Sequence, residues 1–204
     1  MPVNSLDDLY TQKLQLILDA EQQALQAYPQ VMQMAQHDEL RQALQTHMDQ
    51  TRQHVQQLQP LMQQGGGGQQ QTCMSMQALI HEAQQLIGQI QDPDTRDAFL
   101  IGAAQAMEHH EIAAYGTARS WAQELGRDED VEVLERILDQ EKQTDSLLTE
   151  LAERRVNREA SEGATRGDRE VPMRAGSDMG SATGTPRSQG GAQRTGGDQP
   201  TTGS

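Results

Sequence analysis

Acidic and imidazole side chains interrupt the apolar stripes of four segments that have helical periodicity. On a helix, residues three or four positions apart project from the same face. Glu108 therefore shares a face with Glu111, and Glu141 shares a face with Asp145. The residues at such inward positions are Glu21, His47, His54, Glu108, Glu111, Glu141 and Asp145. This set brings carboxylates and imidazoles from four segments toward one interior.

A carboxylate that faces the core of a helical bundle costs several kcal/mol or becomes protonated. No Lys or Arg lies at these inward positions, because Lys142 is displaced by one position from its stripe. The clustered carboxylates therefore need another source of positive charge. Carboxylate oxygens with imidazole nitrogens suit iron or manganese ions, so the pattern predicts a metal centre.

Each of these residues also has an ordinary interpretation when it is taken alone. A single Glu in a helical stripe is typical of a rim position, with its head group in water. A single His such as His47 or His54 is typical of a hydrogen-bonded core residue. The occurrence of such residues in four segments, at about the same depth if the helices alternate in direction, favours the metal centre over these separate explanations.

The elements that must position these residues are helices. Four long segments and one short segment carry apolar residues every three or four positions. Asp92 followed by Pro93 is a strong start signal for one of them. The expected helices cover about residues 5–35, 38–62, 73–90, 92–126 and 128–155. The sequence therefore predicts an all-α fold, a four-helix bundle with a short extra helix in the long connection between helices two and three.

Composition divides the chain and excludes several functions. The net charge of −14 falls entirely within residues 1–155, which we expect to form the bundle domain. Residues 156–204 hold ten of the 18 glycines and predict a disordered, low-complexity tail without which the bundle should still fold.

The acidic charge and 2% aromatic content disfavour a nucleic-acid binder. No apolar run is long enough for a membrane span, and the single Cys73 predicts a cytoplasmic protein.

Four stretches of the chain resemble the YciE/YciF ferritin-like family of bacterial stress-associated proteins. They read DAEQQALQAYPQVM, ELRQALQTHMDQTRQHVQQL, AAQAMEHHEIAAYGTA and LDQEKQTDSLLTELA. The most specific stretch runs from Glu108 to Thr117, and the resemblance covers about residues 5–153. It implies a ferritin-like four-helix bundle, a carboxylate centre with two iron ions or, alternatively, manganese ions, and a homodimer.

The resemblance also extends to individual positions. Residues that match the family's acidic and histidine positions are Glu21, His47, Glu108, Glu111, Glu141 and Asp145. Two positions depart from the family pattern: Gln50 and Gln140 stand where glutamates are usual. Gln140 lies one position off its stripe, so we expect it to matter little. The departure at Gln50 should affect the metal centre more than the one at Gln140, because a neutral amide cannot bridge two ions as a carboxylate does.

Two functions remain open at this point. One is a dimetal oxidoreductase that consumes peroxide or dioxygen. The alternative is a non-catalytic helical stress or interaction protein whose metal site is weakened at Gln50. Metal stoichiometry together with peroxide turnover discriminates between them.

Overall fold

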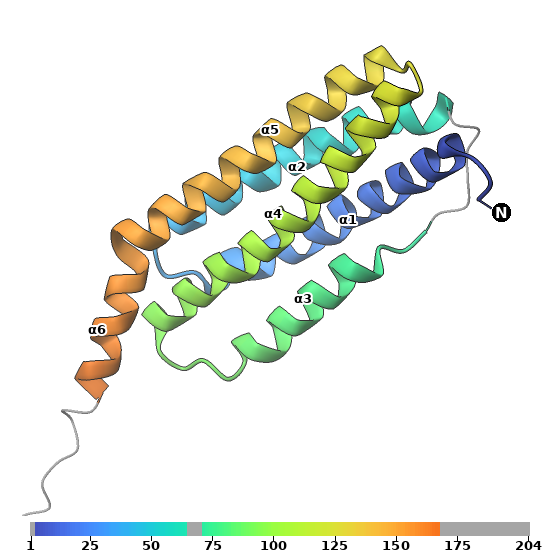
Figure 1. Cartoon of the computed structure of the whole chain (residues 1–204). Coiled ribbons are helices and arrows are strands. Elements are labelled where there is room, and N and C mark those ends of the chain that lie inside the picture. Colours follow the sequence, from blue (N-terminus) through green and yellow to red (C-terminus); the bar gives the residue numbers. More distant parts are fainter. Residues whose placement is uncertain (1–2, 65–70, 168–204) are drawn as a thin grey trace, which may run out of the picture. The chain divides into compact units, whose positions relative to one another are not determined.

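The computed structural model describes residues 3–64 and 71–167, and within these residues it contains helices and no strands. The helices are α1 (Leu6–Met34), α2 (Asp38–Gln64), α3 (Met74–Ile87), α4 (Pro93–Glu124), α5 (Asp128–Leu151), the π-helical turn η1 (Ala152–Val156) and α6 (Asn157–Gly167). α1, α2, α4 and α5 pack against one another, and α3 lies along α1 and α4 (Figure 1). The predicted all-α, ferritin-like bundle with an extra helix between its second and third long helices is confirmed.

Local signals in the sequence set the helix ends. Ser5 caps α1 by accepting a hydrogen bond from the backbone N–H of Asp8 at 3.1 Å. Asp92 caps α4 by accepting from the backbone N–H of Thr95 at 2.7 Å, directly before a proline at the first helical position. Gly126, with φ of 68°, allows the tight turn between α4 and α5. These ends fix the length and register of the helices that carry the polar residues.

Two of the three apolar clusters in the described part of the chain contain residues of all four long helices and leave a polar level between them, while the third joins α3 to α1 and α4. One cluster includes Ala24, Leu44, Ala104 and Leu148, and the other includes Ile17, Leu58, Ala114 and Leu138. Along α2 and α4 the chain passes from the first cluster to the second, and along α1 and α5 it passes in the opposite direction. α2 and α4 therefore run parallel, so the connection that contains α3 must return along the bundle, as in ferritin-like topologies.

The C-terminal boundary predicted at residue 155 is wrong for residues 156–167. There the chain forms the end of η1 and then α6. Val156 is fully buried in the first apolar cluster beside Leu151 and Ala152, and α6 packs on α4. Burial of Val156 and packing of α6 on α4 thus extend the fold beyond the boundary predicted from composition. The rest of the predicted tail, residues 168–204, lies outside the described residues.

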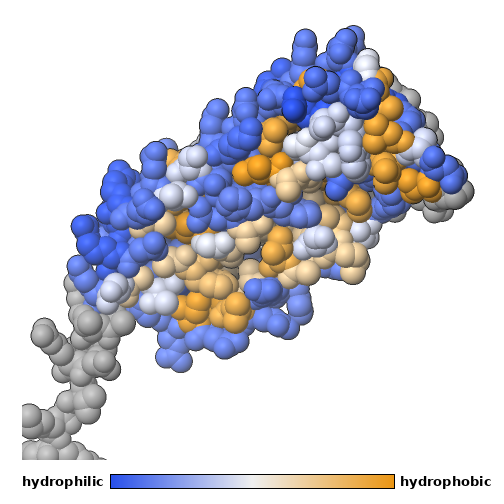
Figure 2. Space-filling view, viewed as in Figure 1, coloured by the Kyte–Doolittle hydropathy of each residue, from blue (hydrophilic) through white to orange (hydrophobic). Residues whose placement is uncertain are grey.

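The surface of the bundle is mostly hydrophilic. Figure 2 shows hydrophilic residues along α5, whereas apolar surface gathers toward α3 and α4. Met74 and Leu86 of α3 are exposed apolar residues. None of the helices in the described ranges is long and apolar enough to cross a membrane.

Candidate metal centre

The level between the two apolar clusters holds most of the residues that the sequence analysis singled out. Six of them are at most 2% exposed: Glu21 from α1, His47 and His54 from α2, Glu108 and Glu111 from α4, and Glu141 from α5. They form two groups, and within each group the possible ligand atoms lie within 4.8 Å of one another. One group is His47, Glu108, Glu111 and Glu141, and the other is Glu21, His54 and Glu141. Glu141 is common to both groups.

The first group is arranged around the imidazole of His47. Its Nε2 lies 2.9 Å from Oε1 of Glu108 and 3.6 Å from Oε2 of Glu141. On the other side of the ring, Nδ1 forms a hydrogen bond of 3.1 Å with Oγ1 of Thr144. When Nδ1 donates this hydrogen bond, the lone pair of Nε2 faces the carboxylates and is available to a metal ion.

The second group is arranged around His54 in the same way. Its Nδ1 lies 3.0 Å from Oε1 of Glu141 and 3.4 Å from Oε1 of Glu21. Its Nε2 lies 2.8 Å from Oε1 of Gln140, an amide oxygen that can only accept. Nε2 must therefore carry a proton, and in the neutral ring Nδ1 keeps the lone pair. The expectation that Gln140 matters little is corrected by this contact, because Gln140 orients the ring.

Two tyrosines border the groups. The hydroxyl of Tyr115 donates a hydrogen bond to Oε1 of Glu21, and its ring meets His54 edge-on. Tyr28 meets His47 edge-on, with ring centroids 5.5 Å apart. The buried hydroxyl of Tyr28 has no hydrogen-bond partner among the residues that the structure describes.

Many polar atoms of the centre are buried without a hydrogen bond in the described part of the chain. They are both carboxylate oxygens of Glu108 and Glu141, one oxygen each of Glu21 and Glu111, Nε2 of His47 and Nδ1 of His54. The approaches of Nε2 of His47 and Nδ1 of His54 to the carboxylate oxygens lack hydrogen-bond geometry. A buried polar atom left in this state costs about 1–3 kcal/mol. A cation among these atoms would satisfy several of them at once, so the donor set fits metal ions.

The electrostatics of the centre show the same need for positive charge. Burial raises the pKa of Glu108 and of Glu141 to about 8, and repulsion from Glu21 adds to the effect. Burial also raises the pKa of Glu111 well above its ordinary value. Burial by itself lowers the pKa of His54, but the carboxylates of Glu141 and Glu21 outweigh it and raise this pKa to about 10. Protons thus neutralise the centre when no metal ion does.

Two of the residues singled out from the sequence lie outside the groups. Asp145 is half-buried and accepts a hydrogen bond from Nε2 of Gln105 on α4 at 3.0 Å. Gln50 is half-buried, and its neighbour Thr51 takes the fully inward position of α2. The Thr51 hydroxyl donates to the backbone oxygen of His47 at 3.0 Å. α2 therefore contributes two imidazoles and no carboxylate to the groups.

Sequence reasoning missed Thr144 and underrated Gln140, the two residues that orient the imidazoles. Both lie on α5 and contact histidines of α2. Their polar side chains carry no periodic signal of their own, since their role depends on how α5 is rotated against α2. A polar residue next to an inward Glu on a facing helix is the only hint that the sequence offers.

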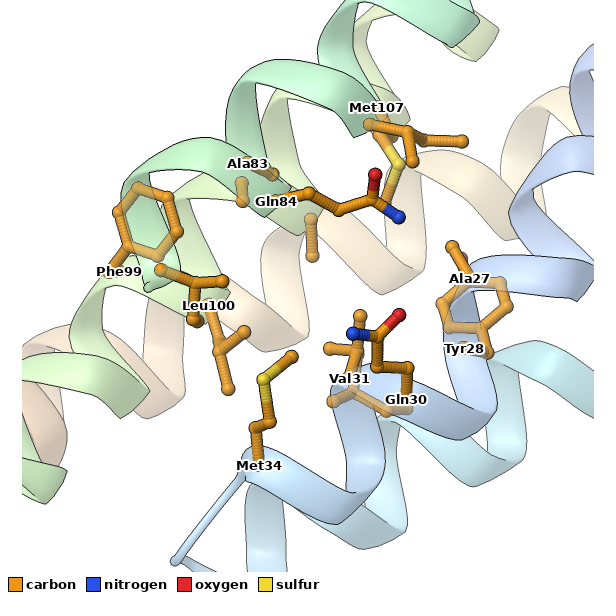
Figure 3. Close-up of a pocket in the computed structure, with 15 residues that line it drawn as sticks. Ala27, Tyr28, Gln30, Val31, Met34, Ala83, Gln84, Phe99, Leu100 and Met107 are labelled. Carbon is orange, nitrogen blue, oxygen red and sulfur yellow. The ribbon is translucent and has the colours of Figure 1, made fainter. Parts of the chain in front are cut away.

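A small apolar cavity lies between α1, α3 and α4, one side chain away from the centre. It has a volume of about 40 Å³, and its lining includes Tyr28, Val31, Leu100 and Met107 (Figure 3). Tyr28 both lines this cavity and contacts His47. The cavity could hold a few water-sized molecules, and none of the candidate ligands lines it.

Fold and site together define a class: ferritin-like helical proteins whose buried His and Glu residues could hold metal ions. The family model described as "Domain of unknown function (DUF892)" matches residues 5–161. The chain belongs to this family, which confirms the resemblance to YciF and its relatives.

Individual relatives agree with this assignment. Protein YciF of Escherichia coli (strain K12) is 31% identical over 166 residues, which cover 80% of this chain and all of YciF. The crystal structure of the E. coli stress protein YciF matches with a TM-score of 0.69 and 28% identity, covering 80% of this chain and 99% of the other. YcfI from Rhodopseudomonas palustris matches with a TM-score of 0.69 and 35% identity, covering 72% of this chain and 94% of the other.

Proposed function

We propose that this protein is a stress-associated metalloprotein that holds two metal ions, iron or alternatively manganese, in a carboxylate-bridged centre. The observation that carries the proposal is the pair of ligand groups that share Glu141. His47, Glu108 and Glu111 would hold one ion, and His54 and Glu21 the other. The two oxygens of Glu141 face different histidines, Oε2 toward His47 and Oε1 toward His54. This is the arrangement that a bridging carboxylate requires.

The proposed reaction is the reduction of peroxide or dioxygen. When bound, two iron ions would supply the two electrons that convert one hydrogen peroxide and two protons into two waters. The protein's own residues orient and shield the site. Thr144 and Gln140 fix the two imidazoles, Tyr115 fixes Glu21, and the apolar clusters exclude bulk water. Tyr28 lines the cavity and contacts His47, so a small oxidant held there would lie one side chain away from the centre.

The second candidate is a non-catalytic stress protein in which the metal only stabilises the bundle. The absence of a carboxylate from α2 among the ligand groups of the described residues favours it. Gln50 cannot supply the missing charge, and a centre with fewer carboxylates holds two ions less tightly through a redox cycle. In this case the protein would act through association with a partner.

The deciding experiment measures metal content and turnover on the full chain. The protein is loaded with Fe²⁺ without oxygen, its iron is quantified, and consumption of hydrogen peroxide is followed in the presence of a reductant. The proposal expects two irons that depend on Glu141, together with turnover that Glu141→Gln abolishes. Glu132→Gln, at an exposed position of the same helix, is the matched control. Glu141-dependent iron without turnover supports the second candidate, and iron content independent of Glu141 contradicts both.

A further inference from the structure

A second cluster of metal-ligating side chains lies where the α1–α2 loop, the first turn of α4 and α6 meet. His37, Asp94 and Glu159 each offer one ligand atom, and these atoms lie within 4.8 Å of one another. None of the three belongs to the groups around Glu141. We propose that this cluster, the α6 site, binds one divalent transition-metal ion such as Zn²⁺ and so fastens α6 to the bundle.

The imidazole of His37 is buried, and its Nε2 lacks a hydrogen-bond partner among the residues that the structure describes. Its side chain is 9% exposed, and Nε2 lies 2.8 Å from Oε2 of Glu159. This approach lacks hydrogen-bond geometry, so Nε2 is a buried nitrogen without a hydrogen bond in the described ranges. A nitrogen in this state is expensive to bury, and a metal ion placed between it and the neighbouring carboxylates removes that cost.

The backbone around His37 is held rigidly by Asp97 of α4. Its Oδ2 accepts a hydrogen bond of 2.7 Å from the backbone N–H of His37. Its Oδ1 accepts one of 2.9 Å from the backbone N–H of Gln36. Because Asp97 is fully buried, these bonds position the ring of His37 without using its side-chain nitrogens.

Both carboxylates of the α6 site are oriented by neighbours that use one oxygen of each. Oε1 of Glu159 accepts from Nε of Arg155 at 2.9 Å, which turns Oε2 toward His37. Oδ1 of Asp94 accepts from Nε2 of Gln36 at 3.1 Å. Partners that hold ligands in place in this way are a regular feature of metal sites.

The donor set suits a borderline divalent cation. One imidazole nitrogen and two carboxylate oxygens are typical zinc ligands at about 2.0–2.2 Å, with water completing the coordination. The two negative charges of the carboxylates match the charge of the ion. The side chain of Glu159 is 30% exposed, so the ion has a route from solvent.

The test titrates Zn²⁺ into the full chain carrying Glu108→Gln and Glu141→Gln, which removes carboxylates from the centre around Glu141. The α6 site does not depend on the proposed function, so one Zn²⁺ per chain should still bind, measured by competition with a chromophoric chelator. Adding His37→Gln should weaken this binding by about tenfold or more. Adding His81→Gln instead, at an exposed histidine of α3, should leave it unchanged.

A second measurement uses the protein without substitutions at the centre around Glu141. Zn²⁺ should slow hydrogen exchange of the amides of residues 157–163, and His37→Gln should abolish this effect. If His37→Gln loses helicity, Glu159→Gln and Asp94→Asn at half-buried positions carry the test in its place. Equal Zn²⁺ affinity with and without these substitutions overturns the proposal and leaves His37 and Glu159 as an ion pair.

Discussion

At the scale of single residues, the position of Glu141 sets it apart from the other carboxylates. Its two oxygens face two different histidines, whereas Glu21 and Glu108 each face one. Removing charge at Glu141 should therefore affect both proposed ions, and removing it at either neighbour should affect one. This difference in the number of ions lost distinguishes a carboxylate shared by two ions from one member of a general acidic cluster.

We predict that Glu141→Gln lowers bound iron by two ions per chain, whereas Glu21→Gln and Glu108→Gln each lower it by about one. The amide keeps the size of the side chain but loses its charge and one acceptor oxygen. Elemental analysis after anaerobic loading measures the effect, with Glu132→Gln as the control. Equal losses in all three variants would contradict a bridging role for Glu141.

Gln140 offers a second test at this scale, since it touches the ring of His54 rather than any proposed ion. Gln140→Leu removes the acceptor of Nε2, so we expect metal affinity to fall about 10- to 100-fold. Gln140→Glu, which restores an acceptor, should rescue the affinity. Competition with a chelator measures both variants, and Gln143→Leu at an exposed position of α5 is the control. Unchanged affinity in Gln140→Leu would show that the ring needs no such support.

At the scale of elements, the C-terminal helix is part of the folded body. A cut after Arg155, which the composition alone predicts to be harmless, removes the fully buried Val156 and the α6 residue Glu159. We expect this cut to lower the free energy of unfolding by about 1–3 kcal/mol from the lost burial of Val156. A cut after Gly167 should cost almost nothing. Denaturant unfolding of the two truncated chains checks this, and equal stabilities would show that α6 adds nothing.

The helices and the polar level of the bundle could be predicted because they follow from periodicity within each helix. The inward positions of Glu21, Glu108 and Glu141 are visible in the spacing of their own segments. What could not be predicted depends on contacts between helices. The rotation of α5 decides that Thr144 and Gln140 reach α2 while Asp145 meets Gln105 of α4. Packing of Val156 likewise overrides the composition of the segment that follows it.

At the scale of the whole molecule, the homodimer implied by the family resemblance stays a prediction, as does the cytoplasmic location. We expect light scattering on the purified chain to give twice the chain mass of 22.5 kDa. The apolar residues Met74 and Leu86 on the surface of α3 are available for such an interface. A mass equal to one chain across a range of concentrations would contradict the dimer.

The last prediction concerns how pH and metal together set the stability of the whole bundle. The pKa of Glu108 and of Glu141 rises from 4.5 to about 8 on folding without metal, chiefly through burial. Between these values the folded state binds more protons than the unfolded state, so the free energy of unfolding must fall as pH rises. The neighbouring carboxylates raise the pKa of His54 from 6.5 to about 10 despite its burial. Between pH 6.5 and 10 this shift also makes the free energy of unfolding fall as pH rises.

Bound metal should oppose this fall in the free energy of unfolding with rising pH, up to about pH 8. The ion takes the place of the protons, so its affinity rises as the carboxyls lose them, and a ligand that binds only the folded state stabilises it by mass action. We therefore expect the gap in melting temperature between loaded and metal-free protein to widen steadily from pH 5 to pH 8. Glu108→Gln should flatten the slope of the metal-free protein, because one titrating group is gone, while Glu132→Gln should leave it unchanged. A metal-free protein whose stability rises across this interval would contradict the charge balance of the centre, since its carboxylates would then gain rather than lose stability on ionising.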